Sequence, residues 1–137
     1  MGEQYRWSSQ AVFPAEELSV GRARGFVGAQ LAAHDLDHLD EDVRLVASEL
    51  ATNAVAHAAT PFVVTVEQFD GSVRLTVDDG SIHHPLFGVA DPMALNGRGL
   101  LLVQHLSKDW GVCGASDRGA KGVWASFHTM QDGLPNG

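Results

Sequence analysis

The chain has 137 residues, 45% of them hydrophobic and 19% charged, and a formal net charge of −8. This length suits one domain with one core, so we expect a single domain over residues 1–137 with a loose tail at 130–137. The negative charge argues against binding a nucleic-acid backbone, and no run of about 18 apolar residues predicts a membrane span. The first residues lack a secretory signal pattern, and the single cysteine, Cys113, fits a reducing cytoplasm.

In chain order, we predict a strand at 4–13, a helix from 16 or 19 to 33 and a second helix at 42–59. Two strands at 62–69 and 72–79 follow, and then a long loop at 80–96. A short helix at 100–106 and two strands at 110–113 and 122–129 complete the prediction. Asp70-Gly71 is a strong signal for a two-residue hairpin, and Asp40 is a good N-cap for the second helix. The order predicts an α/β two-layer sandwich with helices on one face of a mostly antiparallel mixed sheet.

Three polar residues line up on the second predicted helix. At about 100° per residue, its apolar positions form one buried arc made of Val43, Val46, Ala47, Leu50, Ala51 and Ala54. Glu49, Asn53 and His57 are each four residues apart, so they form a row beside that arc. Polar groups are costly at the margin of a core. The row is therefore either a binding site or the ordinary polar edge of an amphipathic helix.

Two further segments offer contacts to a ligand. Alternation in the strand 72–79 places Asp79 on the face that covers the helices and Asp78 on the other face. Asp79 would suit an exocyclic amine such as that of adenine, although an Asp-Gly turn is an alternative interpretation. Gly97-Arg98-Gly99-Leu100 stands at the start of the third helix, where backbone amides attract anions, and the alternative there is a simple turn.

The remaining histidines carry weaker signals. The pair His83-His84 has no cysteine or carboxylate near it at ligand spacing, so a solvated loop is the better interpretation. No Gly-x-Ser-x-Gly elbow supports a Ser-His-Asp triad. We therefore treat four isolated histidines as background: His34, His38, His105 and His128.

Taken in order, these motifs resemble a known superfamily. Glu-x-x-x-Asn-x-x-x-His on a helix, Asp-Gly-Ser at a strand end, a loop and then Gly-Arg-Gly-Leu is similar to the N, G1 and G2 boxes of the GHKL ATPases. Within that superfamily the chain looks most like the small bacterial anti-sigma-factor serine kinases of the RsbW type. The resemblance extends from Phe13-Pro14 to Trp124 and implies the Bergerat ATP-binding fold.

The resemblance implies a role for each matching residue. Glu49 corresponds to the base that takes a proton from the attacking hydroxyl, Asn53 to the ligand that completes the coordination of Mg²⁺ on the ATP phosphates, and Asp79 to the residue that binds the adenine amino group. An ATP lid is implied between Ser81 and Asn96. The other implied nucleotide contacts are His57, Ser81, Gly97, Arg98, Gly99 and Leu100. Two positions depart from the pattern, since Ser81 replaces a glycine of the wider superfamily and Gly122 replaces a hydroxyl residue.

The implied protein is a cytoplasmic, ATP-binding and Mg²⁺-binding regulator. It would transfer the γ-phosphoryl group to a serine of an anti-anti-sigma (STAS-type) protein, and it would bind that protein, a sigma factor or both; a homodimer is compatible with this role. Two alternatives stay open, namely a non-catalytic nucleotide-binding switch that sequesters a partner, and a plain α/β interaction module. Glu49 favours the kinase, because a carboxylate beside phosphates lowers affinity in a protein that only binds.

Overall fold

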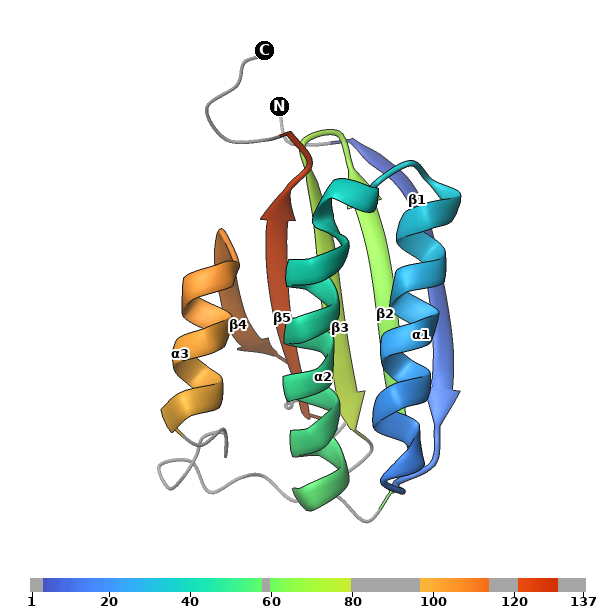
Figure 1. The fold of residues 1–137 in the computed structure, drawn as a ribbon, viewed down its shortest axis with the longest axis vertical. Coiled ribbons are helices and arrows are strands. Elements are labelled where there is room, and N and C mark those ends of the chain that lie inside the picture. Colours follow the sequence, from blue (N-terminus) through green and yellow to red (C-terminus); the bar gives the residue numbers. More distant parts are fainter. Residues whose placement is uncertain (1–3, 58–59, 80–96, 114–120, 131–137) are drawn as a thin grey trace.

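The structure, a computed structural model, describes residues 4–57, 60–79, 97–113 and 121–130. Its elements are β1 (Tyr5–Phe13), α1 (Leu18–Ala33), the 3-10 helix η1 (Asp37–Leu39), α2 (Asp40–His57), β2 (Phe62–Phe69), β3 (Ser72–Asp79), α3 (Gly97–Leu106), β4 (Asp109–Cys113) and β5 (Lys121–His128) (Figure 1). They agree with the predicted elements in type and order, with η1 in addition. The predicted loop with His83-His84 and the predicted tail lie outside the described residues.

The strands form one sheet in the order β1-β2-β3-β5-β4, and each of its described pairings is antiparallel. The hairpin predicted at Asp70-Gly71 is confirmed, because Gln68 of β2 pairs with Val73 of β3. β1 pairs with β2 along its whole length, with a bulge between Tyr5 and Trp7. The sheet therefore has β1 and β4 as its edge strands and β3 in the centre.

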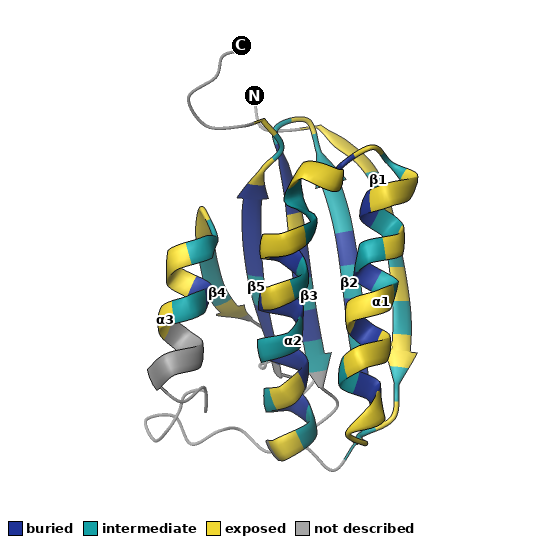
Figure 2. Ribbon diagram, viewed as in Figure 1, coloured by how far each residue is buried: buried dark blue, intermediate teal, exposed yellow. Residues whose placement is uncertain are grey.

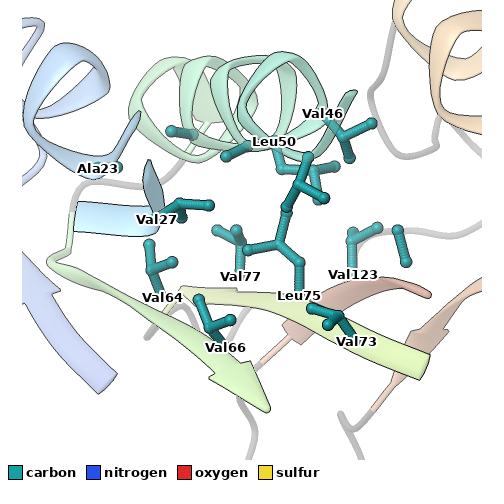
Figure 3. Packing of buried hydrophobic residues seen from close by; sticks show 14 of the residues in the cluster. Ala23, Val27, Val46, Leu50, Val64, Val66, Val73, Leu75, Val77 and Val123 are labelled. Carbon is teal, nitrogen blue, oxygen red and sulfur yellow. The ribbon is translucent and has the colours of Figure 1, made fainter. Parts of the chain in front are cut away.

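The three α-helices lie on one face of this sheet (Figures 1 and 2), which confirms the predicted two-layer sandwich. Residues of both layers meet in one core, where Val46 and Leu50 of α2 lie over Leu75 and Val77 of β3 (Figure 3). The whole predicted arc of α2 is buried. Of the helices that the structure describes, none has the length and hydropathy of a membrane span.

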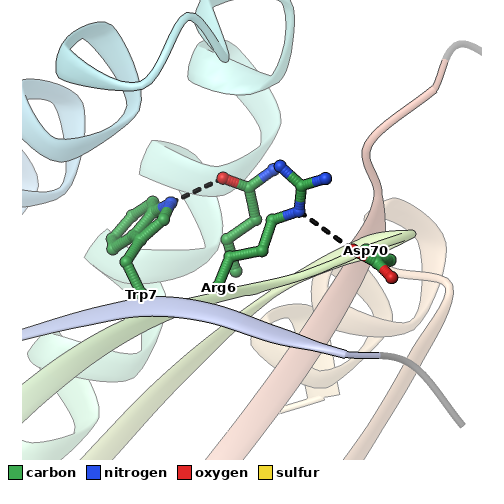
Figure 4. A network of polar contacts seen from close by, with 4 residues as sticks. Arg6, Trp7 and Asp70 are labelled. Carbon is green, nitrogen blue, oxygen red and sulfur yellow. Dashed lines mark hydrogen bonds and ion pairs between the residues drawn. The ribbon is translucent and has the colours of Figure 1, made fainter.

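Side chains at both ends of α1 fix this helix to the edge strand β1. Near its start, the fully buried Ser19 hydroxyl donates to the Pro14 carbonyl at 2.7 Å. Near its end, the His34 ring stacks on Trp7 with 3.7 Å between ring centroids. The Trp7 indole N–H in turn donates to the side-chain oxygen of Gln68 (Figure 4). His34, which the sequence left as background, is thus a packing residue between the two layers.

The start of α2 differs from the prediction. Asp40 is not an N-cap, because the chain enters α2 directly from η1 and Asp40 already has helical angles of φ −56° and ψ −48°. Its carboxylate accepts a hydrogen bond from Arg44 one turn later, at 3.2 Å. This pair lies against Gly28 of α1, where an added Cβ would be 3.1 Å from the Arg44 side chain.

The face of the sheet turned away from the helices carries a row of stacked side chains. The Arg74 guanidinium lies 5.3 Å from the ring centroids of both Phe69 and Trp124. Tyr5 extends the row through an edge contact with Phe69 at 6.1 Å. Trp124 also covers Gly111 of β4, the residue opposite it in the sheet.

Candidate functional site

The motifs singled out in the sequence come from three elements that end or begin together. Figure 1 shows the carboxyl end of α2, the carboxyl end of β3 and the amino end of α3 at the same end of the molecule. α2 packs against both β3 and α3, so the three elements are direct neighbours. Element ends that are 40 positions apart in the chain, at His57 and Gly97, thus come to one end of the sandwich.

The polar row of α2 lies partly in the described structure. Glu49 and Asn53 are half-buried, as expected for residues beside the buried arc, and Leu50 and Ala54 next to them are buried. Glu49 follows Ser48, whose hydroxyl accepts a hydrogen bond from Arg24 of α1 at 3.1 Å. His57 is the last residue of α2, and its side chain lies outside the described structure. From Glu49 to His57 the helix rises about 12 Å.

Asp79 is the last residue of β3, as predicted, and pairs in the sheet with Phe62 and Lys121. Alternation along β3 is confirmed for the described side chains, since Val73, Leu75 and Val77 are buried. The Asp79 side chain and the whole of Ser81 lie outside the described residues. The predicted role of Asp79 at the adenine therefore stays a prediction.

α3 begins at Gly97, so the segment Gly97-Arg98-Gly99-Leu100 forms its first turn and does not precede it. The first turn contains no acidic residue. Free amides and the positive end of the helix dipole suit an anion at such a position. The side chains of these four residues lie outside the described structure, so the backbone placement is what supports a phosphate contact.

Two other expectations concern the metal and the last strand. The described residues contain no group of three or more His, Cys, Asp or Glu side chains that could hold a metal ion. The predicted Mg²⁺ would need oxygen atoms of the nucleotide together with the Asn53 amide, which are the hard ligands that Mg²⁺ prefers.

Gly122, the residue that replaces a hydroxyl residue of the family pattern, is buried in β5 between Asp78 of β3 and Cys113 of β4.

Sequence patterns did not identify a second concave region, which lies at the other end of the sandwich. It is lined by residues of η1, the start of α2, the end of α3 and the end of β5. Its polar residues include His38, Lys108 and His128. No motif could have found it, because its lining comes from separate segments without a common spacing.

Comparison with known proteins bears on the site as a whole. The family model of the histidine kinase-like ATPase domain matches residues 13–126. A search of curated proteins finds no match. A solved structure, that of the RsbU and RsbW domains of Rv1364c from Mycobacterium tuberculosis, is similar with a TM-score of 0.67 and 19% sequence identity. The match covers 91% of this chain and 36% of that one, so this chain spans little more than a third of the solved chain, and at this identity the likeness concerns the fold.

Proposed function

Since this chain belongs to the histidine kinase-like ATPase domain family, we propose that it binds ATP with Mg²⁺ and transfers the γ-phosphoryl group to a serine of another protein. The observation that carries the proposal is the common location of the ends of α2 and β3 and the start of α3 (Figure 1). The proposed site combines the Glu49 carboxylate and the Asn53 amide, in the second half of α2, with Asp79 at the end of β3 and the first backbone amides of α3.

Each group has a distinct task in this proposal. Asp79 accepts a hydrogen bond from the adenine amino group, and the first turn of α3 faces the phosphates. The Asn53 amide oxygen completes the Mg²⁺ coordination. Bound ATP supplies the phosphoryl group, and Mg²⁺ neutralises the charge that develops on it.

Glu49 is the residue that separates a kinase from a nucleotide-binding switch. Its half-buried position beside the core limits its hydration while leaving one side open. In the proposed reaction, the carboxylate takes the proton of the attacking serine hydroxyl as the new P–O bond forms and ADP leaves. A carboxylate held close to phosphates has no use in a switch, because it repels them.

The acceptor and the regulated partner belong to the same proposal. The fold likeness to the RsbW domain supports a regulator that acts on other proteins. We propose that the acceptor is a small STAS-type anti-anti-sigma protein and that the chain sequesters a sigma factor when the acceptor is phosphorylated. Both partners would meet the chain as proteins in the cytoplasm.

The first experiment is calorimetric titration of the full chain with ATP, with and without Mg²⁺. We expect Asp79→Asn to abolish binding and Asn53→Ala to remove the Mg²⁺ dependence. Asp78→Asn is the matched control, because Asp78 is the adjacent carboxylate on the opposite face of β3, and it should bind ATP like the wild type. A folded wild-type chain that ignores millimolar ATP would refute the proposal.

The second experiment follows transfer of radiolabelled γ-phosphate to a STAS-type acceptor. Glu49→Gln should bind ATP like the wild type and transfer phosphate about 10²–10⁴-fold more slowly, the scale of general base catalysis. Equal rates for the two chains would exclude Glu49 as the base. Mg²⁺-dependent ATP binding without any transfer by the wild type would instead identify the non-catalytic switch.

A further inference from the structure

A cavity of about 480 Å³ lies at the end of the sandwich opposite the candidate nucleotide site. It opens between η1 and the amino end of α2 on one side and the carboxyl ends of α3 and β5 on the other. Sites for small molecules usually have volumes of about 300–1,000 Å³. The cavity is therefore large enough for a small metabolite.

The floor of this cavity is apolar. Leu39 and Leu106 are partly buried against the core, and Phe127 of β5 is only 3% exposed. Met130 stands at the rim with 64% exposure. A ligand with an apolar side chain would cover this surface and remove it from water.

Two opposite charges line the same cavity without pairing with each other. Asp42 comes from the first turn of α2, and Lys108 follows α3. In the described part of the chain, the ion pairs are Arg6–Asp70 and Arg44–Asp40, so neither Asp42 nor Lys108 has a charged partner there. A carboxylate and an ammonium group that face one cavity and stay apart match a ligand that carries both charges.

Histidines complete the polar lining. The His38 ring donates to the Thr129 carbonyl and thereby ties η1 to the chain after β5, which closes one wall. His128 is exposed and also lines the cavity.

We propose that this cavity binds a free apolar α-amino acid, such as leucine or phenylalanine. The ammonium group pairs with Asp42, the carboxylate pairs with Lys108, and the side chain lies on Leu39, Leu106 and Phe127. A purely anionic ligand would be repelled by Asp42. A neutral apolar ligand would displace water from both charged groups without giving them new hydrogen bonds. A zwitterion with an apolar side chain pairs with both charged groups and also covers the apolar floor.

This proposal does not depend on ATP binding. The cavity uses the amino end of α2 and the carboxyl end of α3, whereas the candidate nucleotide site uses their opposite ends (Figure 1). If ATP does not bind at the nucleotide site, amino-acid binding in the cavity can still be tested, and the reverse is also true.

Calorimetric titration of the full chain with L-leucine and L-phenylalanine tests the proposal, with the N-acetyl and the amide derivatives as matched ligands. We expect the free amino acid to bind, and we expect loss of either charge to weaken binding about tenfold or more, as for a charge-assisted hydrogen bond. Absence of binding of both amino acids at millimolar concentration, by a chain with the circular dichroism of the folded protein, would overturn the proposal.

Two variants assign the charges. Asp42→Asn should remove the difference between free and N-acetylated ligand, and Lys108→Met should remove the difference between free acid and amide. Arg22→Met, an exposed change on α1 outside the cavity, should keep both differences. If the Asp42 and Lys108 variants discriminate among the ligands like the control, the assigned pairing is wrong.

Discussion

Replacing Gly111 by alanine should destabilise the protein although it adds only one methyl group. The added Cβ would lie 2.9 Å from Cζ2 and Nε1 of Trp124, closer than real Cβ contacts. A shift of the ring would disturb its contact with the Arg74 guanidinium, which also contacts Phe69. Overpacking of this kind costs about 1–3 kcal/mol, and the reduced freedom of the unfolded chain returns only about 0.4–1 kcal/mol. We expect a net loss of roughly 1–2 kcal/mol.

Gly25→Ala provides the matched control, since nothing lies within 4 Å of the Cβ position at this exposed site in α1. It should raise the free energy of unfolding by about 0.5–1 kcal/mol through helix propensity alone. Urea unfolding followed by circular dichroism measures both variants, and equal m-values confirm that the same surface is exposed. A Gly111→Ala protein as stable as the wild type would show that Trp124 does not press on the glycine.

Three other predictions concern the fold. Ser19→Ala should lower the free energy of unfolding by about 1 kcal/mol, because it removes the hydrogen bond to the Pro14 carbonyl; an unchanged urea midpoint would contradict this. Leu75→Ala should cost about 2–5 kcal/mol, since Leu75 is fully buried in the central strand, and thermal unfolding measures the loss. Asp70→Asn should change stability by at most about 0.5 kcal/mol, because its ion pair with Arg6 is largely exposed, and any change should disappear in high salt.

Local patterns were enough to predict most of the fold. The period of the apolar residues in α2 identified its buried face, and Asp70-Gly71 identified the central hairpin. The start of α2 was mispredicted because aspartate is a preferred N-cap residue. In the structure, Asp40 follows η1 directly and already has helical backbone angles. The stacking of His34 on Trp7 was missed, since the two residues are distant in sequence and no periodic signal links them.

The candidate site was predictable to a different degree. The order of its motifs identified the family, and the fold brings the elements that carry them to one end of the molecule. Glu49 and Asn53 lie at the expected margin of the core. The opposite cavity was beyond sequence analysis, because Asp42 lies in α2 and Lys108 follows α3, and the two residues carry a signal only when the tertiary fold places them together.

The order of strands in the sheet has a consequence for how the chain folds. β2 and β3 are joined by a two-residue turn, so the central hairpin can form with little loss of chain entropy. β1 must instead return over a long segment, since Gln10 contacts Thr65 across 55 positions in the chain. Such distant pairing forms slowly. β5, which pairs with the other edge of the hairpin at β3, follows all the other described strands in the chain. The open edge of β3 is therefore the surface that a newly made chain leaves uncovered longest, and a chaperone or a second unfolded chain can pair with it there.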